Sequence, residues 1–530
     1  MSKEPNTIAA KNELGWDPGH NPWVIALTVT LATFMEVLDT SVANVALPHI
    51  AGGLAAGQDE STWVLTSYLV SNAVILPLSG WLSSVFGRKR FYMSCVALFT
   101  IGSFLCGIAP NLPSLILFRV MQGAGGGGLQ PSEQAILADT FPPAKRGMAF
   151  AVYAMAVVVA PALGPAIGGW ITDNYSWRWI FFINIPIGIA SLLLTTLMVT
   201  DPPWLKGRRS GGIKVDYIGF ALLALGLGAL QVVLDKGERE DWFETRYIVV
   251  LTVVAVISLV AVYLWERSHK DPIVEVRLFS ERTFLTSCLM LFLVGFVLYG
   301  TTVLLPQLAQ TLLGYSAELA GLLLMPGGFA LICLLPLVGF LLSRYDARAM
   351  IAVGLGMLAI SMFWMAHRFD LAVDFRTLVL ARVYQASGLA FLFIPINTAA
   401  YAYLPREKNN AASGLINLAR NVGGSVGISF VTTMLARRAQ YHQSMLSTHA
   451  TLLSPMFRGA VQSLSHVFLS SAATTAQRQA YGQLYGQILR QSNMLAYIDN
   501  FWILAVISVV VIPFIFLMKR PPKGAAPAAH

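Results

Sequence analysis

Charge is the scarcest property of this 530-residue chain: 12% of its residues are Asp, Glu, Lys or Arg, whereas 56% are hydrophobic. Soluble domains carry about 25% charged residues. A mean hydropathy of +0.63 over this length is too apolar to be hidden in one soluble core. The composition therefore excludes a soluble globular protein and indicates many membrane spans.

Cysteine is also scarce, and the four residues (Cys95, Cys106, Cys288 and Cys333) all lie in apolar runs. No pair has metal-ligand spacing, so we interpret them as small packing residues. Nucleophile–base pairs, metal-ligand clusters, phosphate loops and a soluble signal-receiving domain are likewise missing. A polytopic membrane enzyme or sensor is thus the weakest interpretation, and we expect neither a metal nor a cofactor.

Long apolar runs recur along nearly the whole chain. A membrane-spanning helix needs roughly 20 such residues, and the first run lacks the small-residue cleavage site of a signal peptide, so we expect it to remain as helix 1. The sequence predicts fourteen spans, with both termini in the cytoplasm: 23–47, 61–83, 91–110, 114–138, 148–171, 179–199, 217–235, 246–265, 283–306, 319–342, 349–366, 376–400, 411–435 and 501–518.

The net charge of +9 follows from the positive-inside rule rather than from nucleic-acid binding. With the N-terminus inside, the dense basic clusters all fall on the cytoplasmic side: Arg88-Lys89-Arg90, Lys206-Gly207-Arg208-Arg209 and Lys519-Arg520. We therefore expect no nucleic-acid partner.

The chain repeats itself at an offset of 263 residues. Arg119 and Gln122 of one copy match Arg382 and Gln385 of the other, and Pro142 matches Pro405. Parallel six-helix halves of this kind are typical of transporters whose binding site lies between the halves. The predicted organisation is an N-terminal tail (1–22), a first six-helix bundle (23–199), a linker with two extra helices (200–282), a second bundle (283–518) and a C-terminal tail (519–530).

The second bundle includes a long polar segment, 436–500, which is rich in Gln and Ser and predicted to be periplasmic. Two interpretations stay open for it. It is either a helical cap over the outer mouth or a docking surface for a periplasmic partner.

Two carboxylates, Glu36 and Asp39, lie inside the apolar stretch "FMEVLDTSVANVALP". A charged group at the centre of a lone membrane helix costs roughly 2.5–3.5 kcal/mol on insertion scales, so such residues normally face a cavity or a partner. Three residues correspond to about 300° of rotation, so both acids share one helix face. Arg119 and Glu133, on the span 114–138, are the candidate counterparts.

Five stretches together resemble the major facilitator superfamily, and more narrowly its fourteen-helix drug:proton antiporters of the EmrB/QacA type. They are "LDTSVANVALP" (38–48), "GWLSSVFGRKR" (80–90), "RVMQGAGGG" (119–127), "APALGPAIGG" (160–169) and "WRWIFFINIPIG" (177–188). The resemblance implies an all-α major facilitator fold in the bacterial inner membrane. To "WRWIFFINIPIG" we assign no chemistry beyond interfacial anchoring by its two tryptophans.

The 80–90 stretch is expected to form a tight cytoplasmic turn, with Gly80 and Gly87 permitting close packing and Arg88 and Lys89 anchoring it. The superfamily pattern usually has an acid where this chain has Ser84. We therefore expect the latch at this turn to be weaker, or to be built from hydroxyl hydrogen bonds.

The 160–169 stretch resembles the motif typical of antiporters. Its glycines Gly164, Gly168 and Gly169 would let another helix approach closely, and Pro165 can kink the helix. The alternative is ordinary small-residue helix packing.

By this resemblance we expect efflux of an amphipathic organic compound driven by the proton gradient. Burial disfavours the charged form of a carboxyl and a nearby arginine favours it, so movement between the two could load and release a proton. Asp39 is the main predicted coupling acid, Glu36 and Glu133 are auxiliary, and Arg119 tunes them. The expected substrate contacts are Gln122, Gln134, Arg382, Gln385 and Asn397.

Alternatives remain at this stage. The acids could form a static polar network that only fixes packing, and the same fold could serve a proton-coupled uptake symporter of a metabolite. The resemblance further implies a periplasmic membrane-fusion adaptor and an outer-membrane channel as partners.

Overall fold

The computed structural model describes residues 18–202, 216–269, 272–342, 344–468 and 473–519, and within them the chain is almost entirely helical, with no strand. The basic cluster 206–209 and most of the two tails lie outside these residues. The first half contains α2 (Pro22–Gly53), α3 (Gln58–Ser61), α4 (Trp63–Phe86), α5 (Arg88–Gly107), α6 (Leu112–Gly126), α7 (Leu129–Thr140), α8 (Pro143–Asn174), α9 (Trp179–Phe182) and α10 (Asn184–Met198).

The linker forms α11 (Tyr217–Lys236) and α12 (Arg246–Ser268), with short 3-10 turns η2 (Trp242–Glu244) and η3 (Val276–Ser280). The second half contains α13 (Arg282–Thr311), α14 (Ala317–Leu341), α15 (Ala347–Arg368), α16 (Phe375–Ala400), η4 (Arg406–Lys408), α17 (Asn409–Ser447), α18 (Pro455–Val467), α19 (Ala473–Val511) and η5 (Ile512–Leu517).

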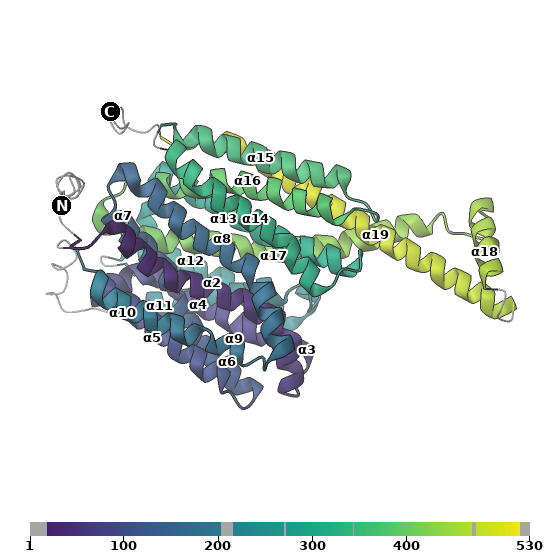
Figure 1. Cartoon of the computed structure of the whole chain (residues 1–530), viewed down its shortest axis with the longest axis horizontal. Helices are drawn as coiled ribbons and strands as arrows, with labels where there is room; N and C mark the ends of the chain where they lie inside the picture. Colours follow the sequence, from purple (N-terminus) through teal and green to yellow (C-terminus); the bar gives the residue numbers. More distant parts are fainter. Residues whose placement is uncertain (1–17, 203–215, 270–271, 343, 469–472, 520–530) are drawn as a thin grey trace, which may run out of the picture.

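Helix packing follows the internal repeat. In the first half α2 packs against α8 and α5 against α6, and in the second half α13 packs against α17 and α15 against α16. These are the same pairs when the two copies are aligned. Figure 1 shows the purple and blue helices of the first half below α13 to α16 of the second. The arrangement is the parallel two-bundle fold that the repeat predicts, whereas the exact domain boundaries stay a prediction.

The number of membrane-spanning helices in the described part of the chain differs from the predicted fourteen. In the described residues, 11 helices are long and apolar enough to cross a membrane, or 12 if the two parts of a bent α8 count as one span. The expected spans 114–138 and 411–435 correspond to α6–α7 and α17, which are not among them. A break separates α6 from α7, and α17 carries Asn417, Arg420 and Asn421. The predicted count of fourteen is therefore not confirmed.

The two halves are closed against each other at one end. We call the end with the start of α2 and the turn at Gly87 the inner end, and the opposite end the outer end. At the inner end a Cβ added to Gly80 would lie 2.6 Å from Ala411 Cα, and one added to Gly339 would lie 3.3 Å from Gly147 O. Because Gly80 has no side chain, α4 and α17 can approach closely there, as the sequence predicts for this residue.

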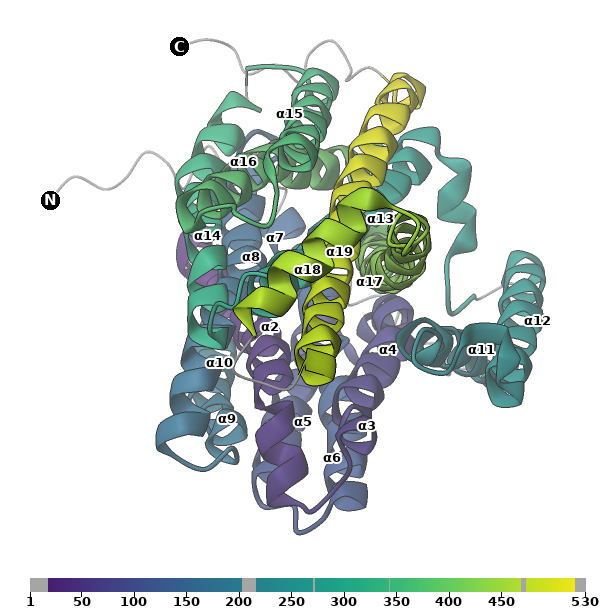
Figure 2. The same ribbon diagram turned by 90° about the vertical axis from the view of Figure 1, so that its right-hand side faces the viewer.

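The two linker helices lie on one side of the bundle. Figure 2 shows α11 beside α4, with α12 farther out. α11 packs on α4 of the first half and on α17 of the second, and Ser425 Oγ of α17 donates a hydrogen bond to Gln231 Oε1 of α11 at 3.0 Å. The inserted pair therefore contacts both halves through α11.

The polar segment 436–500 forms an arm at the outer end. α17 and α19 continue past the bundle, and α18 packs against α19 near the tip. The arm projects away from the bundle instead of lying on it (Figure 1), which does not fit the first of the two interpretations, a cap over the outer mouth. At its base Arg490 Nη2 donates to Leu312 O at 3.1 Å, and at its tip Leu453 and Met456 are 90% and 86% exposed.

The glycine-rich stretch of α8 packs on α2. Gly164 lies against Ser41, and Gly168 lies against Val42, whereas a Cβ on Gly169 would meet no atom within 4 Å. α8 bends by 42° between its parts Lys145–Pro161 and Ala166–Asn174. Pro165 lies in this break, as a kinking proline would, although its side chain is outside the described ones.

Substitution of Gly164 by Ala is expected to destabilise the first bundle. The new Cβ would lie 2.1 Å from Ser41 Oγ and 2.4 Å from Ser41 Cβ, so α2 and α8 must separate. Overpacking of this kind costs about 1–3 kcal/mol, and thermal unfolding in detergent should show it. Gly169→Ala is the matched control in the same motif, and an equal loss in both variants would contradict the packing argument.

Candidate proton-coupling site

A buried ion pair joins α2 and α6. Arg119 Nη1 donates to Asp39 Oδ2 at 2.6 Å, and the two side chains are 0% and 1% exposed. Asp39 Oδ1 also accepts from Gln122 Nε2 at 2.9 Å and from Asn184 Nδ2 at 2.7 Å. Asp39 and Arg119 are thus in direct contact, and the carboxylate accepts hydrogen bonds on both oxygens, whereas their role in proton coupling stays a prediction.

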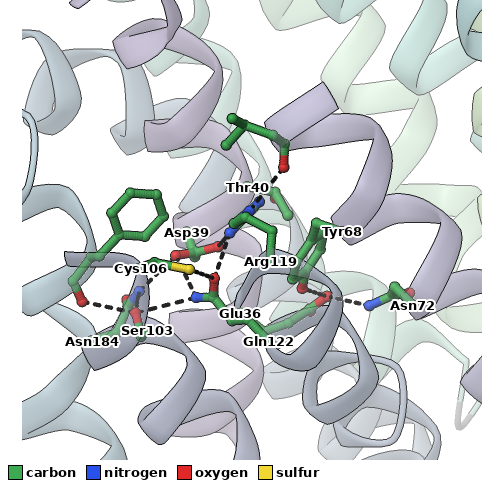
Figure 3. Close-up of polar contacts among 12 residues, drawn as sticks. Glu36, Asp39, Thr40, Tyr68, Asn72, Ser103, Cys106, Arg119, Gln122 and Asn184 are labelled. Carbon is green, nitrogen blue, oxygen red and sulfur yellow. Dashed lines mark hydrogen bonds and ion pairs between the residues drawn. The ribbon is translucent and has the colours of Figure 1, made fainter. Parts of the chain in front are cut away.

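Arg119 is held by more than its carboxylate. Nη1 donates to Gln122 Oε1 at 2.7 Å and Nε donates to Val64 O at 3.0 Å, while the guanidinium lies 4.3 Å from the ring centroid of Tyr68. Stacking on an aromatic face stabilises a desolvated guanidinium. Figure 3 shows these groups converging from α2, α4, α5, α6 and α10.

The network also contains residues that the sequence did not single out. Asn184 lies in the stretch to which we assigned no chemistry, yet it donates to Asp39 and, at 2.9 Å, to Ser103 Oγ. Ser103 Oγ in turn donates to Phe181 O at 2.8 Å. A lone polar residue in an apolar helix start was the available signal for Asn184, because such groups are buried only when they find partners.

Glu36 lies one helical turn before Asp39 and has a separate set of partners. It accepts hydrogen bonds from Gln130 Nε2 at 2.6 Å, Tyr68 Oη at 3.1 Å and Asn72 Nδ2 at 3.3 Å. It is buried, and the donors come from α7 and α4. The two acids were expected to share one helix face, and they take part in two neighbouring but distinct polar clusters (Figure 3).

Glu133 is the least satisfied of the three acids. Its Oε1 accepts from Thr30 Oγ1 at 2.6 Å, whereas Oε2 is buried without a hydrogen-bond partner among the described residues. Leaving a buried carboxyl oxygen without a partner is energetically costly. The auxiliary role of Glu133 in proton coupling stays a prediction.

The inner end holds a second buried ion pair. Arg88 Nη1 donates to Asp139 Oδ2 at 2.5 Å, both side chains being almost fully buried, and Asn409 Nδ2 of the second half donates to Asp139 Oδ1 at 2.7 Å. Ser84 Oγ donates only to Trp81 O of its own helix, at 2.7 Å. Of the two alternatives for this turn, Ser84 thus forms no hydroxyl link to another described helix in this conformation, in which Asp139 connects the halves.

The tight turn and the basic anchor predicted for the inner end are both present. Gly87 has φ +85°, a backbone conformation that favours glycine. Lys89 is anchored twice, because its backbone N–H donates to Asp201 Oδ1 at 2.8 Å and its Nζ donates to Thr196 O at 2.7 Å.

The second half repeats the basic part of the site without its acid. Arg382 Nη1 donates to Gln385 Oε1 at 2.7 Å, just as Arg119 does to Gln122. Thr302 lies at the repeat offset from Asp39, and Arg382 Nη2 reaches its Oγ1 only at 3.5 Å. Because a threonine hydroxyl does not ionise at physiological pH, the Arg382 site lacks the titratable carboxyl that Asp39 provides beside Arg119.

The remaining predicted substrate contacts are buried in the closed conformation. Gln134 Oε1 accepts from Asn417 Nδ2 at 2.9 Å and from Tyr401 Oη at 3.2 Å, both in the second half. Asn397 Nδ2 donates to Phe393 O within its own helix at 2.7 Å. Their contact with substrate stays a prediction, whereas Gln134 is clearly placed at the interface between the halves.

Comparison with known proteins gives a consistent family. The sequence profile described as Major Facilitator Superfamily matches residues 29–428. The chain is 38% identical to the multidrug export protein EmrB of Escherichia coli K12, over 95% of this chain and 96% of that protein. It is also 38% identical to the fatty acid resistance protein FarB of Neisseria gonorrhoeae (94% and 96%) and 28% identical to the colistin resistance protein EmrB of Acinetobacter baumannii (96% and 98%).

Solved structures agree on the fold. The proton:xylose symporter XylE matches with a TM-score of 0.61 at 14% identity, over 95% of this chain and 97% of that one. The human organic anion transporter MFSD10 matches with 0.61 at 13% identity, over 94% and 100%. At this identity the likeness concerns the fold alone.

Removal of the charge on Asp39 is expected to destabilise the protein strongly. Asp39→Asn leaves Arg119 buried without its counter-charge, which costs about 3–5 kcal/mol, whereas the double variant Asp39→Asn/Arg119→Gln should recover part of this loss. Unfolding free energies in detergent measure the cycle. Asp173→Asn, at an exposed carboxylate, is the control, and purely additive losses would show that the pair is not energetically coupled.

Proposed function

The chain belongs to the major facilitator superfamily and is a multi-pass protein of the bacterial cytoplasmic membrane, and we propose that it exports amphipathic organic compounds in exchange for protons. The observation that carries the proposal is the buried Asp39–Arg119 pair within the first bundle, next to two further buried acids. Relatives named for multidrug export, fatty acid resistance and colistin resistance support an amphipathic substrate.

Asp39 can exchange a proton because its partners lie on different helices. The carboxylate is stabilised by Arg119 of α6 and Asn184 of α10 while itself on α2. A shift of these helices that lengthens the contact with Arg119 would favour the protonated acid, since a buried carboxylate without its counter-charge is costly. Proton uptake from outside and release inside then accompany the alternating opening of the two ends.

The conformation seen here is closed at its inner end, which faces the cytoplasm in the expected orientation. Asp139 connects Arg88 of the first half with Asn409 of the second, and Gly80 lies against Ala411. Opening toward the cytoplasm must break these contacts. The alternative of a metabolite uptake symporter uses the same fold, but no contact in the structure favours it.

The outer arm supports a periplasmic adaptor as a partner, with an outer-membrane channel beyond it. The arm extends past the bundle (Figure 1), and it exposes Leu452, Leu453 and Met456 together around the start of α18. Apolar side chains gathered on a projecting element are typical of an interaction site. The adaptor would bind there and carry substrate away from the outer end.

Transport in everted vesicles tests the exporter. Addition of a cation such as ethidium should dissipate the pH gradient in wild type. In Asp39→Asn the rate of dissipation should be at least about tenfold lower, which corresponds to roughly 1.4 kcal/mol in the activation barrier. Asp173→Asn serves as the control. Equal rates in wild type and Asp39→Asn would exclude Asp39 as the coupling acid and shift the role to Glu36 or Glu133.

Acidic substitutions at the tip of the arm test the proposed docking of the adaptor. Leu453→Asp/Met456→Asp should abolish drug resistance in cells that depend on the adaptor, yet leave proton-coupled transport in vesicles unchanged, because the tip is far from the site. Gln462→Asp, also exposed on α18, adds a similar charge outside the apolar tip and should behave as wild type. Resistance that survives the tip variant would contradict docking at this arm.

A further inference from the structure

Arg420 is a buried cation of the second half whose hydrogen bonds reach into the first. Its side chain is 1% exposed, Nη1 donates to Tyr153 Oη of α8 at 2.8 Å, and Nη2 donates to Gln130 Oε1 of α7. It has no carboxylate partner among the described residues, where the three buried acids near the site all lie in the first half. Glu36 attracts it through space, and a hydrogen-bonded link between them needs an intermediate group.

Gln130 is that group, because its amide has one acceptor end and one donor end. While Oε1 accepts from Arg420 and, at 3.0 Å, from Tyr153 Oη, Nε2 donates to Glu36 Oε2 at 2.6 Å. A continuous path of hydrogen bonds thus runs from Glu36 on α2 through Gln130 on α7 to Arg420 on α17. The path crosses between the halves at Arg420, on the same helix as the Asn409 contact of the inner end.

The protonation state of Glu36 determines which end of the Gln130 side-chain amide can face it. An ionised carboxylate only accepts hydrogen bonds, so it holds the NH₂ of Gln130 and leaves the amide oxygen for Arg420. A proton on the oxygen that faces Gln130 requires an acceptor instead. If the amide turns to supply one, its NH₂ faces the guanidinium, which has no acceptor capacity, and the bond to Arg420 is lost.

We infer that Gln130 and Arg420 relay the protonation of Glu36 to the contact between the two halves. Ionised Glu36 holds the inner end closed through Gln130 and Arg420. Protonated Glu36 releases Arg420 and permits opening toward the cytoplasm. The direction of this coupling rests on the proposed proton-driven export, because a proton taken up outside would then favour the conformation that releases it inside.

Besides Arg420, other titratable groups interact with Glu36: Asp39 on its own helix, Tyr68 on α4, Glu133 on α7, Tyr153 on α8 and Tyr299 on α13. Tyr153 also links the halves, through Arg420 and Asn417, but it reaches Glu36 only through Gln130. Asp39 and Glu133 take their printed hydrogen bonds within the first half. Gln130 and Arg420 are accordingly positioning residues that act through Glu36.

The distance between the inner ends of the halves tests the relay without any substrate. Spin labels would be attached at Lys145→Cys in α8 and Tyr345→Cys after α14, both exposed, in a variant with the four native cysteines replaced. In wild type we expect the short distance at mildly alkaline pH and a growing long-distance population on acidification.

Glu36→Gln, Gln130→Leu and Arg420→Gln should each raise the open-to-closed ratio at alkaline pH by about tenfold or more, as expected for loss of a hydrogen bond to a charged group. Each should also remove the pH response, and Glu36→Gln/Arg420→Gln should open no further than either single variant. Arg382→Gln is the matched control, because it removes a buried arginine that bonds only within its own half.

Three results would overturn the relay: wild-type distances in Gln130→Leu or Arg420→Gln, an unchanged pH response in Glu36→Gln, or additive opening in the double variant. If Arg420→Gln does not fold, Arg420→Lys retains the charge but cannot reach Tyr153 and Gln130 in the same forked geometry, and intermediate opening is expected. Loss of dye-driven proton flux with an intact distance response would reject the proposed export but not the relay.

Discussion

The ion pair between Asp39 and Arg119 is the interaction on which the rest of the site depends. A charge inside a membrane protein must be paired or removed, because lipid offers no hydrogen bonds. Here both oxygens of Asp39 and two helices besides its own, α6 and α10, are used to satisfy this requirement. The close approach of α8 to α2 at Gly164 packs the helix that carries Asp39, so glycine spacing and charge burial serve the same arrangement.

The two halves share a backbone plan but differ in chemistry. In each half an arginine precedes a glutamine by three residues on the same helix, and the arginine Nη1 donates a hydrogen bond to the glutamine Oε1. Only the first half adds carboxylates, since Thr302 stands where Asp39 would repeat. A symmetric fold with acids on one side can rock about its central interface while the proton chemistry stays in one bundle.

Closure of the inner end relies on polar contacts across the interface as well as on packing. Asn409 and Arg420 both belong to α17, and each bonds a residue of α7, Asp139 and Gln130 respectively. Bonds between a buried charge and an amide are strong in a low-dielectric interior, yet they are lost together when the helices separate. The interface is therefore suited to two discrete states rather than to gradual opening.

Much of the fold and part of the candidate site could be predicted from the sequence, because hydropathy and the internal repeat depend on local composition. The helical membrane fold, the parallel halves, the inner turn at Gly87 and the pairing of Asp39 with Arg119 were all expected. Only the tertiary structure placed Asn184, Gln130 and Arg420, since a lone polar residue in an apolar helix does not reveal its partner on another helix. The structure also shows that Asp139, and not Ser84, connects the halves at the inner end, and that the segment 436–500 projects as an arm. Neither could be read from the sequence, because side-chain direction and helix continuation depend on packing between distant segments.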